Sequence, residues 1–334
     1  MTERNMIFAD ADEHPHEADH PHFNESFYFN FVDPGNGLYG LMRVGNRLNE
    51  GHGEVTVLLF LPDGKAAFRY VKPAVTVPTF DLGGVSVEIV KPHREVRIRY
   101  TGDIHVMADG RALEDPRSAF ADSPIEHIDI DVLFTTTAPS RGWMHGVTTS
   151  PIDVDATFAP SHYEAPGRLT GRIRVGTRDF AVDGHGVRDH SWGPRTWQGP
   201  EYYRWISVNA PDGDTFVAWL MKLDGLVRHW GFLFRDGEMH ELAELSVRTR
   251  YGAPPELYPQ TVTIQATAGP HQVTLTGERV ALVPLRHHKK GDASTARLSE
   301  LVFCYDGLGD APAYGVAEFH DLITDGHFTG YDEA

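Results

Sequence analysis

The chain has 334 residues, of which 41% are hydrophobic and 23% charged, a composition typical of a folded protein with one large core or two smaller ones. Its formal net charge of -17 argues against a nucleic acid or an anionic membrane surface as the natural partner. The single cysteine, Cys304, excludes an intramolecular disulfide and suits a reducing compartment, so we expect a cytoplasmic protein. No apolar run reaches the roughly 18 residues that would suggest a membrane span.

The N-terminal segment 1–22 is interpreted as a polar leader. It has no basic stretch followed by an apolar run, so it does not resemble a secretory signal. Its sequence HPHEADHPH contains four closely spaced histidines, His14, His16, His20 and His22. Such spacing can bind a metal ion, but no compact ligand motif such as His-Glu-x-x-His occurs in the chain. We therefore expect no metal site, and a flexible leader instead.

The first half of the chain is predicted to form β-strands, because β-branched and aromatic residues alternate with polar ones. The predicted strands are 26–32, 54–62, 85–90, 95–101 and 125–136. Turn sequences separate them, such as DPGNG at 33–37 and PDG at 62–64. A short helix is expected near 115–122.

The second half continues the same pattern. The predicted strands are 168–176, 202–210, 214–225, 260–268, 271–284 and 300–307. Turn sequences occur at 211–214 and 235–237. No long window carries an amphipathic helical stripe, so the predicted fold class is all-β with few short helices.

An internal similarity predicts two β-units. Glu25 and Glu201 each precede an aromatic strand, a glycine-containing turn and an apolar strand, and a further strand and an Asp-Gly turn follow in both halves. A β-rich composition could also produce this similarity by chance. The weakly patterned, proline-bearing stretch 150–167 suggests a boundary, giving domains 23–160 and 161–334. Closing each unit into an antiparallel barrel would remove exposed strand edges and leave room for a small ligand.

The densest group of chemically active residues lies in GHGVRDHSWGPRTW, residues 184–197. If 186–192 is a strand, alternation divides its side chains between two faces. One face would carry Arg188, His190 and Trp192, and the other Asp189 and Ser191. The glycines of this stretch suggest bulges or a close approach of backbones, and a shift of one residue would exchange the two faces.

The longer segment 162–197, and above all RDHSWG at 188–193, resembles the lipocalin-like superfamily of carotenoid 1,2-hydratases (hydroxyneurosporene synthases) and tocopherol cyclases. The stretch 24–51, which starts with Asn-Glu-Ser, is similar to the opening of the first barrel in that group. The resemblance implies two lipocalin-like (calycin) barrels packed together. It also implies chemistry that hydrates, isomerises or cyclises hydrophobic alkenes without an organic cofactor.

Three residues are candidate catalytic groups. Asp189 could act as a carboxylic acid whose pKa is raised in an apolar barrel, so that it protonates an alkene. His190 would then be the base, or the group that orients water. An arginine beside Asp189 would lower its pKa, so a pairing with Arg188 would make His190 the better acid-base candidate. Glu25 either faces a cavity or pairs with a basic residue at the barrel rim.

A further set of side chains is expected to contact the substrate. The candidates are Tyr28, Arg188, Trp192, Arg195, Tyr203 and Trp205. Aromatic faces would stabilise a carbocation-like or aromatic intermediate. For Trp192 and Arg195 a structural alternative stays open, because an arginine stacked on a glycine-flanked tryptophan closes one end of ordinary lipocalin barrels. HYE at 162–164 is interpreted as part of a polar linker between the barrels.

The function favoured by these patterns is a cofactor-independent hydratase, lyase or cyclase that uses acid-base catalysis. Its substrate would be a hydrophobic small molecule such as a terpenoid, a steroid or an aromatic compound. The alternative is a lipocalin-like carrier or sensor that binds such a ligand without converting it, and a homodimer is a candidate assembly. Nucleophilic and dinucleotide-dependent enzymes are disfavoured, because neither a Gly-x-Ser-x-Gly motif nor a complete Gly-x-Gly-x-x-Gly fingerprint occurs.

Overall fold

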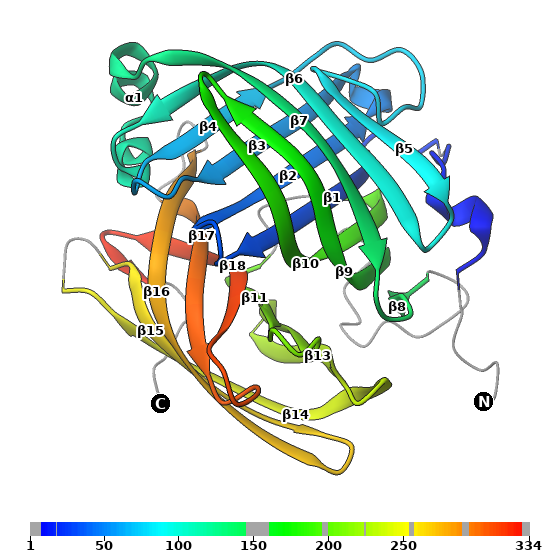
Figure 1. The fold of residues 1–334 in the computed structure, drawn as a ribbon, viewed down its shortest axis with the longest axis vertical. Coiled ribbons are helices and arrows are strands. Elements are labelled where there is room, and N and C mark those ends of the chain that lie inside the picture. The colour runs from blue at the N-terminus through cyan, green and yellow to red at the C-terminus, as the bar shows by residue number, and fades with distance from the viewer. Residues whose placement is uncertain are drawn as a thin grey trace. The chain divides into compact units, whose positions relative to one another are not determined.

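The computed structural model describes residues 8–17, 19–144, 160–195, 200–223, 225–253, 257–288 and 294–328. It consists almost entirely of antiparallel strands and divides into two compact units (Figure 1). The first unit comprises residues 1–109 and 117–196, and the second comprises residues 110–116 and 197–334. Within the described residues, no helix combines the length and the apolar character that a membrane crossing requires.

The first unit is a closed eight-stranded barrel, because β10 pairs with both β9 and β1. Its strands, in spatial order, are β1 (Phe23–Asp33), β2 (Leu38–Arg47), β3 (His52–Phe60), β4 (Ala66–Val71), β6 (Glu95–Met107), β7 (Ile125–Thr136), β9 (Ser161–Val175) and β10 (Arg178–Pro194). Two further strands extend the sheet: β5 (Val85–Lys91) pairs with β6, and β8 (Arg141–Trp143) pairs with β9. Short helical turns complete the unit: η1 (Asp10–Glu13), η2 (Leu48–Glu50) and α1 (Pro116–Asp122).

The interior of the first barrel is filled by alternate side chains of its strands. On β1 these are Phe27, Phe29 and Phe31, which belong to one buried apolar cluster with residues of the other strands. Successive side chains of a strand point to opposite faces, so odd-numbered residues of β1 face inward. Glu25 therefore lies on the inward row of β1, next to this apolar core.

The second unit is also a closed barrel of eight antiparallel strands, because β11 pairs with both β12 and β18. Its strands are β11 (Tyr202–Asn209), β12 (Thr215–Leu223), β13 (Leu226–Arg235), β14 (Glu238–Tyr251), β15 (Pro259–Ala268), β16 (His271–His288), β17 (Ser294–Asp306) and β18 (Ala313–Thr324). The short strand β19 (His327–Phe328) pairs with β18, and η3 (Gly110–Glu114) belongs to this unit. Its core includes Ile206, Phe216, Phe303 and Phe319.

The predicted fold class is confirmed, since two antiparallel β-barrels make up the chain. The two halves compared in the sequence occupy equivalent places, because Glu25 lies on β1 and Glu201 directly precedes β11, the first strands of their barrels. The expected short helix is α1. The interpretation of 162–164 as a linker was wrong, because these residues lie within β9.

The division between the units lies after 196 rather than at the expected position between 160 and 161. The physical reason is the closure of the first barrel. Without β9 and β10, the edges of β7 and β1 would have no partner strands, since β9 pairs with β7 and β10 pairs with β1. Residues 161–194 therefore complete the first barrel.

Candidate functional site

The described part of the N-terminal segment, residues 8–17 and 19–22, packs onto the first barrel, which corrects the expectation of a flexible leader for these residues. Phe8 and Glu13 are buried. The ring of Phe8 lies 4.7 Å from that of Tyr163 and 6.3 Å from that of Trp192. Burial of these side chains holds the following residues, including His16, against β1 and β10.

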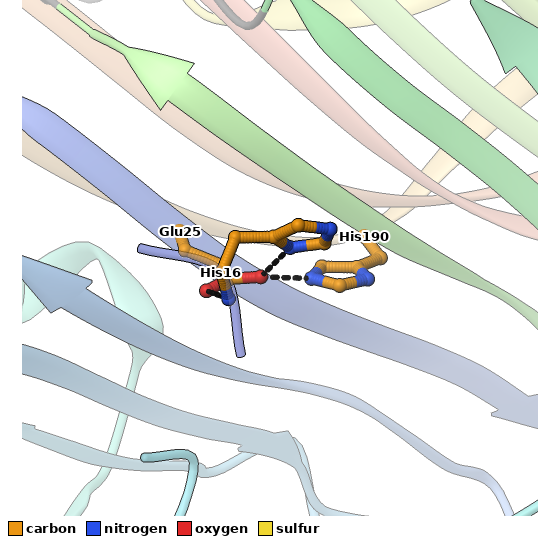
Figure 2. Close-up of side chains that lie close together, drawn as sticks. All are labelled: His16, Glu25 and His190. Atoms are coloured by element: carbon orange, nitrogen blue, oxygen red, sulfur yellow. Dashed lines mark hydrogen bonds and ion pairs between the residues drawn. The ribbon is translucent and has the colours of Figure 1, made fainter. Parts of the chain in front are cut away.

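Two histidines meet one carboxylate at this place (Figure 2). The Oε1 atom of Glu25 lies 2.9 Å from Nε2 of His190 and 2.7 Å from Nδ1 of His16. The backbone N–H of His16 donates to the other oxygen, Oε2, at 2.8 Å. Glu25 comes from β1 and His190 from β10, which are paired strands, and His16 comes from the segment after η1. We call these three residues the His-Glu-His cluster.

Aromatic rings fix the orientation of both imidazoles. His190 stacks on Phe27, with ring centroids 4.1 Å apart, and meets the edge of Phe80 at 5.6 Å. His16 lies parallel to Trp192 at 4.4 Å. These contacts restrict the rings to one plane each, so the polar atoms of the cluster are held in place by packing.

A second buried network lies behind His190. The hydroxyl of Tyr163 is 3.3 Å from Nδ1 of His190 and donates to the carboxylate of Glu13. Arg188 donates to Glu13 Oε1 at 2.7 Å and to the Tyr163 hydroxyl at 3.3 Å. Nδ1 of His93 lies 3.1 Å from Glu13 Oε1. A continuous chain of polar contacts thus runs from His16 through Glu25, His190 and Tyr163 to Glu13.

Burial and hydrogen bonding move the pKa values of the cluster in different directions. Burial alone would raise the pKa of Glu25, but the bonds from His16 and His190 outweigh it and hold that pKa below its usual value. Burial lowers the pKa of His190 although Glu25 opposes this. Burial acts in the same direction on His16, but its contacts with Glu25 and Asp12 raise its pKa overall. An ionised Glu25 is therefore the stable state near neutral pH.

The second network contains an ion pair. Burial raises the pKa of Glu13, but the charge of Arg188 and the hydrogen bonds around the carboxylate together hold it well below its usual range. Burial raises the pKa of Tyr163 well above its usual value. Glu13 and Arg188 thus remain charged, while Tyr163 keeps its hydroxyl proton.

A small, partly open cavity of about 10 Å³, roughly the space of one water molecule, reaches the cluster. It is lined by His16, Glu17, Phe23, Glu25, Asn46, Leu48, Asn49 and Pro78. Nδ2 of Asn46 donates to the backbone carbonyls of Val77 and Thr79, at 3.3 and 3.1 Å. Its Oδ1 is buried and has no hydrogen-bond partner among the described residues. Asn46 therefore combines a place on the cavity wall with one unused acceptor.

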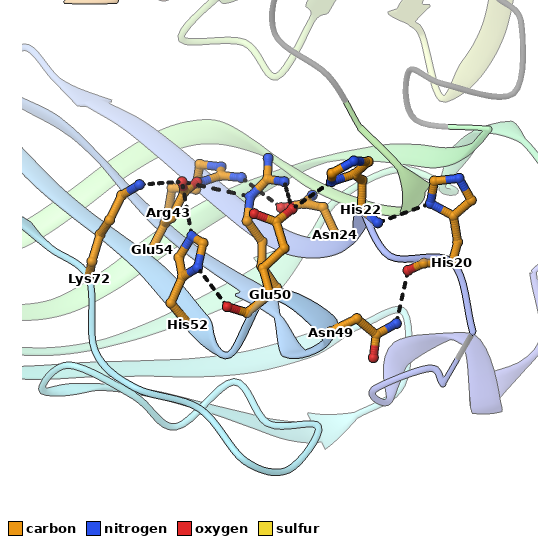
Figure 3. Close-up of polar contacts among 10 residues, drawn as sticks. His20, His22, Asn24, Arg43, Asn49, Glu50, His52, Glu54 and Lys72 are labelled. Carbon is orange, nitrogen blue, oxygen red and sulfur yellow. Dashed lines mark hydrogen bonds and ion pairs between the residues drawn. The ribbon is translucent and has the colours of Figure 1, made fainter.

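Charged residues of β2, β3 and η2 form a network of polar contacts (Figure 3). Glu54 lies 3.1 Å from Arg43, 3.7 Å from Arg47 and 3.6 Å from Lys72. Burial raises the pKa of Glu54, but these three cations lower it to about 2. Arg47 also pairs with Glu50 at 3.0 Å. This group links β2 and β3 to the turn η2, two of whose residues, Leu48 and Asn49, line the cavity.

Comparison with protein families gives one match, over residues 9–323, to a family described as a domain of unknown function, DUF7064. The chain belongs to the DUF7064 family. No curated protein matches it in sequence.

Three solved structures share the fold of this DUF7064 chain. One, solved as an AttH from Nitrosomonas europaea, has a TM-score of 0.58 at 14% identity and covers 96% of this chain and 98% of its own. CghA has a TM-score of 0.57 at 12% identity, with coverage of 92% and 90%, and was also solved with Sch210972. Kievitone hydratase from Nectria haematococca has a TM-score of 0.50 at 11% identity, with coverage of 90% and 89%. These similarities support the expected fold.

The predicted assignment of the side chains of 186–192 to two faces of a strand agrees with the contacts in the DUF7064 chain. Arg188 lies over the Phe27 ring at 5.9 Å, and His190 and Trp192 are in ring contact at 5.0 Å. No bulge interrupts β10 here. Instead the glycines allow a close backbone approach, since a Cβ on Gly186 would lie 1.9 Å from the carbonyl oxygen of Asn30.

Several predicted site residues lie outside the His-Glu-His cluster. Asp189 is half-buried on the other face of β10 and lies opposite Tyr28 and Glu164 on the neighbouring strands. The guanidinium of Arg188 pairs with Glu13, so it belongs to the second network. The backbone N–H of Arg195 donates to the carbonyl of His22 at 3.2 Å.

Tyr203 and Trp205 belong to β11 in the second unit. The Tyr203 hydroxyl donates to Glu318 at 2.7 Å, and its ring stacks on that of His320. Trp205 is buried, with its ring 6.4 Å from that of Trp219. Neither residue is part of the cluster in the first unit.

Sequence reasoning missed Glu13, His93 and Tyr163, and it dismissed His16. The signal for His16 was present in the run of histidines, but nothing in the spacing separates it from its exposed neighbours His14 and His20. Tyr163 could have been found by extending strand alternation through 162–164. Glu13 and Arg188 are 175 positions apart, and no local pattern connects them.

Proposed function

We propose that the chain is a hydratase or lyase that adds water to, or removes it from, a hydrophobic small molecule by acid-base catalysis. The observation that carries the proposal is the buried contact of 2.9 Å between Glu25 and His190, with His16 beside it on the cavity wall. A carboxylate held between two imidazoles can release and recover a proton without moving the backbone.

In the hydration direction, a proton leaves the His16–Glu25 pair and bonds to one carbon of a substrate alkene. Water then bonds to the cationic carbon that results, and the proton that this water loses returns to the pair. His190 holds Glu25 in position through its 2.9 Å contact, while Trp192 packs on His16. Dehydration follows the same steps in reverse, with protonation of a substrate hydroxyl.

Two proteins that share the fold support this reaction class. Kievitone hydratase carries the reaction in its name, and CghA was solved with the small molecule Sch210972. Both lie far from this chain in sequence, so their substrates are not transferred to it. A terpenoid, a steroid or an aromatic compound remains the proposed class of substrate.

Asp189 is a second candidate for the acid-base residue of this reaction. It is half-buried on the strand that carries His190, but on the opposite face. Comparison of Asp189→Asn with Glu25→Gln therefore decides which face of β10 the substrate meets. We expect the larger loss of turnover in Glu25→Gln.

A non-catalytic carrier is the second candidate function. It is favoured by one observation, that both ring nitrogens of His190 are already within contact distance of protein groups, Glu25 and Tyr163. In a carrier, these contacts would serve only to hold the side chains of β1, β9 and β10 in place. The two candidates differ in whether a bound compound leaves the protein unchanged.

The experiment begins with extraction and mass spectrometry of compounds that co-purify with the full chain. Turnover of the compound identified is then compared in wild type, Glu25→Gln, His190→Ala and the control His14→Ala, whose side chain is exposed. We expect losses of about 10²- to 10⁴-fold in the first two variants and none in the control. Full turnover in both Glu25→Gln and His190→Ala would remove the assignment.

A further inference from the structure

We propose that His16, Glu25 and His190 form a binding site for a divalent first-row transition metal ion. The three ligand atoms would be Nδ1 of His16, Oε1 of Glu25 and Nε2 of His190, which all lie within 4.8 Å of one another (Figure 2). Two imidazole nitrogens and one carboxylate oxygen are a donor set that suits zinc and iron(II). This inference uses the side chains of the proposed function but does not depend on that function.

The other polar atom of His16 and of Glu25, which would not bind the metal, already has a protein partner that orients the side chain. Nε2 of His16 lies 3.6 Å from the Asp12 carboxylate, as in the carboxylate–histidine pairs that orient metal ligands. Oε2 of Glu25 accepts the backbone N–H of His16 at 2.8 Å. These contacts leave Nδ1 of His16 and Oε1 of Glu25 directed at the same point as His190.

Both ring nitrogens of His190 face oxygen atoms. Nε2 lies 2.9 Å from Glu25 Oε1, and Nδ1 lies 3.3 Å from the hydroxyl of Tyr163, whose proton goes to Glu13. A neutral imidazole carries one N–H and one lone pair. With the N–H directed at Tyr163, the lone pair of Nε2 and the Glu25 oxygen are both available to one metal ion.

The distances are compatible with metal binding after a small adjustment. Zinc bonds to nitrogen and oxygen at about 2.0–2.2 Å, which places neighbouring ligand atoms of a tetrahedral site roughly 3.3 Å apart. Oε1 of Glu25 is 2.7 and 2.9 Å from the two nitrogens. Each contact must therefore widen by roughly half an ångström. His16, with 25% of its side chain exposed, can move away from Glu25, whereas the buried Glu25–His190 pair needs a small shift of one side chain.

The cavity provides an open coordination position. His16 and Glu25 line it, and so does Asn46, which is 4% exposed and whose Oδ1 is buried without a hydrogen-bond partner among the described residues. This oxygen could accept a hydrogen bond from a water molecule bound to the ion. Three protein ligands with one open position are typical of catalytic rather than structural zinc sites.

The test measures Zn²⁺ binding to the metal-stripped full chain by titration calorimetry. The variants are His16→Ala, Glu25→Gln and His190→Ala, and the matched control is a triple substitution of His14, His20 and His22 by alanine. We expect one equivalent of Zn²⁺ in wild type and in the control, and affinity lowered at least 100-fold in each cluster variant. Absence of saturable binding in wild type, or its loss in the control alone, would overturn the proposal.

A second measurement, of the change in Tm on adding Zn²⁺, tests the site even if the Glu25 and His190 variants fold poorly. His16→Ala removes only a partly exposed ring, so this variant is expected to fold, and Zn²⁺ should raise the Tm of wild type and control but not of His16→Ala. Co²⁺ in place of Zn²⁺ should give visible absorption bands that disappear in the same variant. Equal Zn²⁺-induced shifts in wild type and His16→Ala would contradict the site.

The two proposals fail in different ways. If Zn²⁺ does not bind while turnover falls in Glu25→Gln, the metal site is wrong and acid-base catalysis stands. If Zn²⁺ binds to the cluster but the co-purified compound is not converted, with or without the metal, the metal site stands and the hydratase assignment is lost.

Discussion

Glu25 connects the N-terminal segment to the barrel through its two carboxylate oxygens. One oxygen contacts both imidazoles and the other accepts the backbone N–H of His16. Since a carboxylate has about four acceptor sites, it can hold three donors at once. The same residue therefore anchors the segment and supplies the charge of the site.

Arg188 and Glu13 form a buried ion pair whose disruption should be costly. Arg188→Met leaves the Glu13 carboxylate without the guanidinium that lies 2.7 Å away. We expect the free energy of unfolding to fall by about 3–5 kcal/mol, because a buried charge loses its partner. The double variant Glu13→Gln with Arg188→Met should recover at least half of this loss. Urea unfolding gives the free energy of unfolding of wild type, Arg188→Met and the double variant. A loss below about 1 kcal/mol in Arg188→Met would contradict the buried pairing.

Glu54 should make stability depend on pH at the acidic end. Its folded-state pKa is lowered to about 2 by Arg43, Arg47 and Lys72. A lowered carboxyl pKa stabilises the fold above the unfolded value of 4.5, and this stability is lost as the pH falls towards 2. The contribution is of the order of 3 kcal/mol, because each pKa unit corresponds to about 1.4 kcal/mol.

The measurement compares unfolding free energies of wild type and Glu54→Gln between pH 6 and pH 2.5. The difference should be largest at pH 6 and should shrink as the pH falls. Glu88→Gln is the control, because Glu88 and its partner Arg99 are both exposed and such pairs contribute little. Parallel curves for wild type and Glu54→Gln would show that the pKa of Glu54 is not lowered in the folded protein.

At the level of elements, the pairing of β1 with β10 places Glu25 and His190 together. Phe27 lies directly opposite His190, and Glu25 lies opposite Trp192. The two catalytic candidates are therefore diagonal neighbours on the inner face, within reach of long side chains. Any change that separates these strands should disturb the site as well as the fold.

The substitution Gly186→Ala should push β10 away from β1. A Cβ at this position would lie 1.9 Å from the carbonyl oxygen of Asn30, which is backbone and cannot move away cheaply. We expect the free energy of unfolding to fall by about 1–3 kcal/mol or more, because the strands must part. The matched control is Gly35→Ala, whose Cβ would meet only the Asp33 side chain, at 3.5 Å. Equal thermal stability of the two variants would contradict the close approach.

The sequence predicts the strands well where alternation is regular. The predicted strand 125–136 coincides with β7, because one face of this strand is buried in the core. The faces of Arg188, His190 and Trp192 were also predicted correctly by alternation. The partners of these residues could not be predicted, because Glu13 and His16 reach the site through tertiary packing of a segment that looks polar and unpatterned.

At the level of the whole molecule, barrel closure determines where the first unit ends. A chain ending at 160 lacks β9 and β10, whereas one ending at 196 contains all eight strands of the first barrel. We expect the longer chain to show a cooperative thermal transition and the shorter one to aggregate or stay unfolded. Circular dichroism and NMR test this, and a cooperatively folded 1–160 chain would contradict the division after 196.

The cytoplasmic location and the homodimer stay predictions from the sequence. The net charge of -17 remains consistent with a protein that avoids nucleic acids. Size-exclusion chromatography with light scattering would decide the assembly.

Oxygen transfer from labelled water tests the central claim most directly. The co-purified compound is incubated with the full chain in H₂¹⁸O, and its mass is followed over time. A hydratase or lyase built on Glu25 and His190 should introduce one ¹⁸O atom into the compound, or remove one water from it, with wild type and not with Glu25→Gln. A compound that binds to wild type and neither gains label nor loses water would contradict the account, and would identify the protein as a carrier.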